Sequence, residues 1–312
     1  MALFHLGGLT VMYPLNFLLV TCMKQFPEKF EPDITIKSMY GIFPPAIWNG
    51  GRDEIGMTKP DQIDTTLNML DMAGISLRFT FTNSIITEEM LDDPFCNFLC
   101  ERSSHLKTKP AVIVNSDILE KYIREKYPHF DIISSTCKCI RNAEDIEREL
   151  EKDYSLVVLD YNYCNNFEFL NTIKQKDRVE LLINCGCVPN CPVRKKHYKF
   201  HSQLQIDFNE YIKTNPWYTY EKGEFKEPCG FKLNPADAMK HSTFVSREDL
   251  FGKYIPMGFE NFKLEGRTGH PFGVLEYYLY FFAKPEYRDE LRFEFINKLI
   301  HMGVFSVNAI KL

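Results

Sequence analysis

Residues 181–202 read LLINCGCVPNCPVRKKHYKFHS, and this stretch decides how the chain folds around it. An apolar run ends in Asn184, and three cysteines follow, at positions 185, 187 and 191. Glycine, proline and asparagine residues between the cysteines break regular structure. The pattern predicts a buried strand that stops at a tight loop, with a basic segment beyond the loop.

The same succession of an apolar strand and a helix recurs along the chain. We expect eight strands, at residues 33–39, 75–82, 110–114, 130–134, 154–159, 179–183, 242–246 and 259–264. Helical spacing predicts a helix or helical turn after each of them. A sustained repeat of this kind implies a parallel sheet, and eight units is the number that closes a barrel. The predicted fold class is therefore α/β, a (β/α)8 TIM-barrel-like domain. An open doubly wound sheet is the alternative, weakened because no glycine-rich dinucleotide fingerprint follows the first strand.

One barrel domain is expected to span residues 1–312. Residues 1–32 form an N-terminal strand and helix segment, residues 192–241 an irregular insertion after the sixth strand, and residues 285–312 a C-terminal helix. The apolar stretch from residue 6 to residue 23 is short and interrupted by glycine, proline and asparagine. It predicts a strand or turn followed by a buried helix, and no membrane span.

The composition is that of an ordinary globular protein, with 45% hydrophobic and 25% charged residues. The formal net charge is −5, so there is no global electrostatic reason to bind nucleic acid, although a local basic cleft stays open as an alternative. Ten cysteines without a recognisable secretory signal indicate a reducing compartment. We therefore expect a cytoplasmic protein whose cysteines are thiols or metal ligands.

Polar side chains follow most of the predicted strands. In a barrel the carboxyl ends of the strands meet at one mouth, where active sites lie. The alternative is that asparagine and aspartate are good turn residues anywhere. We predict a substrate-binding group of Asn49, Arg52, Asn83, Asn115, Asp160, Asn184 and Arg194. His197, Glu265 and Arg267 are the predicted catalytic residues, because they offer an acid–base group and a cation for a carboxylate or phosphate.

The cysteine loop is a candidate metal site. Cys187 and Cys191 lie on it, and Cys229 lies in the insertion that leaves the same strand, so it can return to the same mouth. Cys164 is the predicted fourth ligand because it ends the preceding strand, with Cys185 or an open position as alternatives. Thiolates suit both zinc and iron–sulfur clusters. Cys96 and Cys100 lie four residues apart on one helical face, and we expect them in the core.

Two motifs resemble the U-32 peptidase family, also called collagenase-like peptidases. Its members carry a strand ending in Asn, then Cys-x-x-x-Cys and a His, and a late Phe-Lys-Ile-Glu-Gly-Arg strand. Here Asn184, Cys187, Cys191 and His197 occur in that order, and residues 262–267 read Phe-Lys-Leu-Glu-Gly-Arg. The resemblance spans residues 34–280. The longer family signature is absent, and Cys185 stands where the family often has an acidic residue.

The resemblance implies a barrel-like fold and, from several members, a [4Fe–4S] cluster held by four cysteines. Those members modify RNA bases or hydroxylate quinone precursors without oxygen. The expected function is therefore an oxygen-independent hydroxylation or modification of an RNA base or a small aromatic substrate. A protein partner could complete the site.

Two other functions stay open. The first is a peptidase of the collagenase-like type, which could use Cys187 with His197, or a metal held by acids such as Asp160 and Glu265. The chain has neither a Gly-x-Ser-x-Gly elbow nor a His-Glu-x-x-His zinc pair. The second is a non-catalytic protein whose cysteines hold structural zinc.

Overall fold

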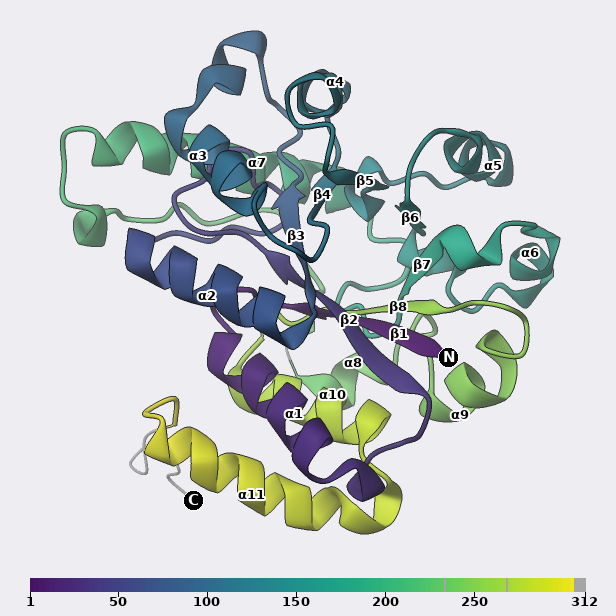
Figure 1. The fold of residues 1–312 in the computed structure, drawn as a ribbon. Helices are drawn as coiled ribbons and strands as arrows, with labels where there is room; N and C mark the ends of the chain where they lie inside the picture. Colours follow the sequence, from purple (N-terminus) through teal and green to yellow (C-terminus); the bar gives the residue numbers. More distant parts are fainter. Residues whose placement is uncertain (233, 268, 306–312) are drawn as a thin grey trace.

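Eight parallel strands close into a barrel in the computed structural model, which describes residues 1–232, 234–267 and 269–305 (Figure 1). Each strand pairs with the next one along the chain, and the last pairs with the first. This confirms the predicted barrel. The strands are β1 (Ala2–Gly7), β2 (Ile34–Gly41), β3 (Ser76–Phe81), β4 (Ala111–Val114), β5 (Asp131–Ser134), β6 (Leu156–Val158), β7 (Val179–Leu182) and β8 (Asn261–Leu264).

Helices cover the outside of the barrel (Figure 1). They follow the predicted helical spacing closely; for example, α2 ends at Gly74, whose positive φ of 70° suits a glycine. The helices are α1 (Tyr13–Gln25), α2 (Pro60–Ala73), α3 (Pro94–Ser103), α4 (Asp117–Lys126), α5 (Ala143–Glu151), α6 (Phe167–Thr172), α7 (Arg194–Ile212), α8 (Pro235–Ala238), α9 (Arg247–Asp249), α10 (Pro271–Phe282) and α11 (Arg288–His301).

The predicted strand at residues 242–246 is wrong. This segment has no strand conformation, and its backbone bond to the barrel runs from Val245 N to the oxygen of Ile183. The place next to β7 is taken by β8, and the eighth strand is the N-terminal β1. The insertion therefore follows the seventh strand of the barrel, not the sixth.

The apolar residues form two cores. The larger one lies between the strands and the helices and includes Cys96 and Cys100, which confirms their predicted place in the core. A smaller one fills the barrel and consists of Tyr40, Ala111, Ile113, Ile133, Leu156 and Val158. The barrel is thus a packed structure, and open space is left only at its ends.

A charged layer lies inside the barrel beside the smaller core. Glu180 of β7 is fully buried and receives hydrogen bonds from Arg78 of β3 and, at 2.9 Å, from Lys263 of β8. His5 of β1 lies 3.5 Å from the same carboxylate. Burial, with Arg78 nearby, lowers the pKa of His5 to about 3, so this imidazole is neutral at physiological pH.

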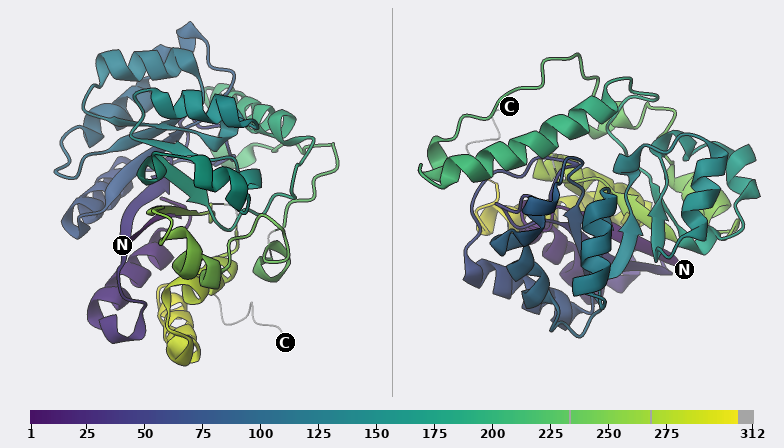
Figure 2. Two further views of the ribbon diagram at one scale, coloured as in Figure 1. Left: turned by 90° about the vertical axis from the view of Figure 1, so that its right-hand side faces the viewer. Right: turned by 90° about the horizontal axis from the view of Figure 1, so that it is seen from above.

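The insertion begins with α7, the long green helix of Figure 2, and the residues after this helix run back along it. Tyr220 packs against Phe208, and Phe225 stacks on His197 about three turns nearer the helix start. At the far end of this segment, Lys232 N donates to the oxygen of Gly186 in the cysteine loop at 2.7 Å. The part of the insertion that follows α7 therefore covers this helix and returns to the cysteine loop.

None of the helices in the described part of the chain combines the length and the apolar character needed to cross a bilayer. The stretch predicted as a strand or turn followed by a buried helix forms β1 and α1.

Candidate functional site

A small cavity of about 60 Å³ lies at the carboxyl ends of the strands, where the sequence predicts the site. Its charged lining consists of Arg52, Lys263, Arg267 and Glu265. Each of these cations has a carboxylate partner: Arg52 pairs with Glu265, Lys263 with Glu180 and Arg267 with Glu54. The other lining residues are Tyr40, Gly51, Thr80, Thr82, Ile113, Ser135, Thr136, Cys137, Val158, Leu182, Cys185 and Tyr198.

Glu265 joins the cysteine loop to the loop that follows β2. Its carboxylate accepts a hydrogen bond from Arg52 and another, at 3.0 Å, from the backbone N–H of Gly186. Asn184 holds the backbone of Glu265 on both sides, accepting from its N–H at 2.6 Å and donating to its oxygen at 3.0 Å. The late strand and the cysteine loop are therefore held in one fixed geometry.

Arg267 does not pair with Glu265. Its Nη1 donates to Glu54 and Asn49 at 3.1 Å each and to Thr80 at 2.7 Å. Burial raises the pKa of Glu54, and the nearby Arg267 opposes that rise. Arg267 therefore has a structural partner of its own while still lining the mouth.

Arg194, at the start of α7, makes the second buried ion pair at this end of the barrel. Its Nη1 donates to Asp160 at 2.6 Å, and its Nη2 donates to Thr136 Oγ1 at 2.9 Å. Both side chains of the pair are 1% exposed. The guanidinium also lies 4.3 Å from the centre of the Tyr161 ring. These contacts fix the first turn of α7 against the ends of β5 and β6.

Cys185 and Cys187 form a thiol pair beside Arg52. The neighbouring Cys185 thiol lowers the pKa of Cys187 to about 7. Burial opposes the shift, and Arg52 supports it. Burial raises the pKa of Cys185 well above its ordinary value. Near neutral pH a substantial fraction of Cys187 is therefore thiolate, which is the reactive and metal-binding form.

The four cysteines predicted as metal ligands do not meet in one place. Cys164 is buried and its Sγ lies 3.4 Å from the oxygen of Leu182, while Cys191 lines a separate surface hollow with Cys139. In the described ranges, no three side chains of Cys, His, Asp or Glu lie close enough to hold a metal ion. As placed, this donor set does not fit a four-thiolate cluster.

The Cys229 segment packs against the cysteine loop, although Cys229 does not line the mouth cavity. Gly230 touches Val188: a Cβ on this glycine would lie 2.6 Å from that side chain. Together with the bond from Lys232 to Gly186, this packs the Cys229 segment onto the Cys187 loop. The Cys229 thiol is exposed and lies 3.8 Å from Nδ1 of His197.

His197 is half-buried on α7, between His201 and the residues that follow this helix. Its ring stacks on Phe225 at 4.4 Å and lies 4.4 Å from the ring of His201. Burial, with His201 and Arg52 nearby, lowers the pKa of His197 to about 4. His201 in turn lies 2.8 Å from Asp53. His197 is thus a neutral imidazole next to Cys229, and it does not line the cavity at the mouth.

The remaining predicted residues have different surroundings. Asn49 donates to the oxygen of Arg52 at 2.6 Å and thereby shapes the loop that carries this arginine. Asn83 donates to the backbone oxygens of Ile47 and Ser202, so it ties α7 to the barrel. Asn115 is half-buried and does not line the mouth cavity.

Sequence reasoning missed several residues of the mouth. Tyr40 and Tyr198 line the cavity, and burial raises the pKa of both phenols well above the ordinary value. Tyr198 could have been found, because it lies one helical turn after Arg194, and its hydroxyl accepts from Nε of that residue at 2.9 Å. Cys137 also lines the cavity, and the only feature of the sequence that indicated this was its position just after the predicted strand at residues 130–134.

Comparison with known proteins supports the resemblance inferred from the motifs. No protein-family model matches the chain. A protein of Methanocaldococcus jannaschii named as an uncharacterized protease is 26% identical over 144 residues. The match covers 44% of this chain and 40% of that relative, so the chain spans well under half of the relative's length.

A solved structure of a U32 peptidase has the same fold. It matches with a TM-score of 0.53 over 85% of this chain and 93% of that chain, at 14% sequence identity. Together with the partial sequence match, this supports the resemblance of the chain to the U-32 peptidase family.

Proposed function

From the resemblance to U-32 peptidases we propose that the chain is a barrel enzyme that modifies a small aromatic substrate or a nucleic-acid base. The observation that carries the proposal is the mouth cavity, which is lined by Arg52 and its partner Glu265, beside Lys263 and Arg267, whose carboxylate partners are Glu180 and Glu54. A cavity of about 60 Å³ holds roughly two waters, so it suits one carboxylate or phosphate group of a substrate. A polypeptide segment would have to displace the neighbouring side chains.

Arg52 is the proposed anion-binding residue. The guanidinium of Arg52 donates a hydrogen bond to Glu265. A substrate anion would either replace this carboxylate or bind to the remaining N–H groups of the guanidinium. Arg267 is committed to Glu54, Asn49 and Thr80 and would act mainly by placing positive charge at the mouth. Glu265 would position Arg52.

The proposal is tested by titrating the protein with benzoate, a small aromatic carboxylate. Arg52→Gln should weaken benzoate binding by about tenfold, roughly 1.4 kcal/mol, while Arg52→Lys should lose less because it keeps the charge. Arg148→Gln is the matched control, since Arg148 lies on the exposed face of α5. Equal benzoate affinity in the wild type and in Arg52→Gln would rule out an anion site at Arg52.

An iron–sulfur cluster is the proposed cofactor, with zinc as the alternative. Cys187 and Cys229 are its best-supported ligands, because their segments pack together and the pKa of Cys187 is lowered to about 7. Cys185 is a better third ligand than Cys164, whose thiol bonds to Leu182. When bound, such a cluster would supply redox chemistry. We assign no reaction step to it, because the described thiols do not form a complete ligand set.

Anaerobic purification followed by iron, sulfide and zinc analysis tests the cofactor. Iron and sulfide in matching amounts support a cluster, and one zinc per chain with neither supports the structural alternative. Cys187→Ser and Cys229→Ser should each lose the metal, since a hydroxyl is a harder ligand than thiolate. Cys100→Ser is the control, because Cys100 is buried in α3. Full metal content in Cys229→Ser would remove the insertion from the site.

A peptidase is the second candidate, favoured by one observation. The pKa of Cys187 is lowered to about 7, so a substantial fraction of this thiol is ionised near neutral pH, and thiolates are the nucleophiles of cysteine peptidases. The Methanocaldococcus relative is also named a protease. Incubation with denatured collagen or casein distinguishes the two: cleavage that is lost in Cys187→Ser would favour the peptidase.

A further inference from the structure

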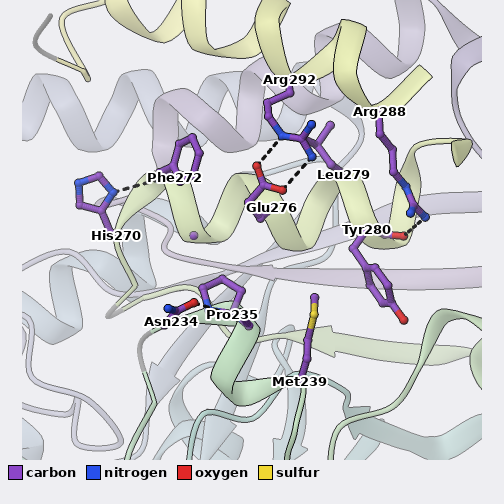
Figure 3. A pocket seen from close by; sticks show the side chains of 12 residues that line it. Asn234, Pro235, Met239, His270, Phe272, Glu276, Leu279, Tyr280, Arg288 and Arg292 are labelled. Atoms are coloured by element: carbon purple, nitrogen blue, oxygen red, sulfur yellow. Dashed lines mark hydrogen bonds and ion pairs between the residues drawn. The ribbon is translucent and has the colours of Figure 1, made fainter. Parts of the chain in front are cut away.

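A second and larger cavity lies outside the barrel, between α8, α10 and α11 (Figure 3). Its volume is about 650 Å³, within the range of small-molecule binding sites. None of the four charged residues at the barrel mouth lines it. It is therefore a separate space, and the proposed function does not account for it.

The walls of this outer cavity are largely apolar. Phe272 and Leu279 of α10 form one side, and Pro235 and Met239 lie opposite, at and just after α8 (Figure 3). The Phe272 side chain is 44% exposed, so its ring is accessible to a ligand in this cavity. Such walls favour a ligand with an aromatic or aliphatic body.

Two arginines of α11 supply the charge. Arg292 is neutralised by Glu276, through two hydrogen bonds of 2.7 and 3.0 Å (Figure 3). Arg288 has no carboxylate partner within the described ranges, and its Nη2 donates to the backbone oxygen of Tyr280 at 3.0 Å. Its Nε is buried and has no hydrogen-bond acceptor among the described residues. One cation without a described counter-charge therefore lines a largely apolar cavity, and a buried donor without an acceptor is unfavourable unless a ligand supplies one.

We propose that this outer cavity is a second ligand site, for a small molecule with an apolar, aromatic body and one carboxylate. The carboxylate pairs with Arg288, where it supplies the missing counter-charge, and the body packs between Phe272 and Met239. An arginine beside a carboxylate gives both charge and directional hydrogen bonds. The site goes beyond the proposed function, because it lies apart from the mouth and needs no metal.

Calorimetric titration with phenylbutyrate, and with phenylbutanol as its neutral counterpart, tests the site. The wild-type protein should bind the acid at least about tenfold more tightly than the alcohol. Arg288→Gln should weaken binding of the acid by about tenfold and leave the alcohol unchanged. Phe272→Ala, a change at an exposed position that the fold should tolerate, should weaken both probes.

The matched control is Arg148→Gln, which removes an exposed arginine from α5 and should change neither affinity. Three results would overturn the proposal: no saturable binding of phenylbutyrate to the wild-type protein, equal affinities for acid and alcohol, or unchanged affinity for the acid in Arg288→Gln. Unchanged acid affinity in Arg288→Gln would also place any bound acid elsewhere, for example at the barrel mouth.

Discussion

At the scale of single residues, two arginines at the mouth of the barrel form ion pairs within the protein and also line the cavity where a ligand would bind. Arg52 and Arg267 both line the cavity, but each has its own carboxylate, Glu265 and Glu54 respectively. From sequence alone, a Glu265–Arg267 pair is the plausible structural contact, since only Gly266 separates them. The structure replaces it with two pairs that join distant parts of the chain.

The substitution Arg267→Lys tests how far Arg267 stabilises the fold and how far it binds a ligand. Lysine keeps the charge opposite Glu54 but cannot reproduce the hydrogen bonds of Nη1 to three oxygen atoms. We expect the free energy of unfolding to fall by about 1–2 kcal/mol, and benzoate affinity to fall by less than in Arg52→Gln, because lysine keeps the positive charge at the mouth. Denaturant unfolding and titration on one preparation measure both. A lower free energy of unfolding with unchanged benzoate affinity would mean that Arg267 has a purely structural role.

At the scale of elements, the strands carry a charged layer that sequence patterns do not reveal. Glu180 lies in the middle of β7, where a buried strand of a barrel is expected to be apolar. It is balanced by Arg78 from β3 and Lys263 from β8. Burial by itself would raise the pKa of Glu180, but Lys263 and Arg78 outweigh it and hold the pKa well below its ordinary value.

Glu180→Gln should therefore be strongly destabilising, by about 3–5 kcal/mol, because Arg78 and Lys263 are left buried without a counter-charge. The depressed pKa means that this contribution is fully present above the ordinary glutamate pKa of about 4.3 and is lost as pH falls below it. The gap in stability between wild type and Glu180→Gln should thus narrow in acid.

Denaturant unfolding at neutral and acidic pH measures this gap. The control is Glu147→Gln, at an exposed position of α5, which should change stability little at either pH. His5 acts in the same direction, since a pKa lowered to about 3 makes its protonation below about pH 6.5 favour the unfolded chain. If Glu180→Gln were as stable as the wild type, the ion pairs of Glu180 with Arg78 and Lys263 would not contribute to the stability of the barrel.

At the scale of the whole molecule, closure of the barrel depends on the first and last strands. β1 pairs with both β2 and β8, so the N-terminal segment is part of the sheet and not an addition to it. Its removal would also take away His5 and open two strand edges, which favour aggregation.

Deletion of residues 1–32 should therefore abolish the folded state. Replacement of residues 216–224 by a short glycine–serine linker is the contrasting change, because these residues lie on the outside of α7 and include the exposed Trp217 and Tyr218. Circular dichroism and size-exclusion chromatography should show a folded protein for the linker variant and an aggregated one for the deletion. A soluble, folded deletion variant would mean that the barrel closes without β1.

The sequence by itself determined the fold class, because apolar strands alternating with helices leave few arrangements other than a parallel barrel. It also placed Asn184, Asp160, Glu265 and the arginines near one mouth, because strand ends of a barrel must meet there. It did not find β1 with certainty, and it assigned residues 242–246 to a strand, since a short apolar run is consistent with either a strand or a loop.

Only the tertiary structure decided which side chains touch. Pairings such as Arg52 with Glu265 and Arg78 with Glu180 join residues more than a hundred positions apart, and no local spacing encodes them. The same holds for the cysteines: Cys164 and Cys187 end neighbouring strands, but the first thiol bonds to Leu182 while the second bonds to Cys185. Local sequence sets where a strand stops, whereas the direction of each side chain and its partner depend on how the whole barrel closes.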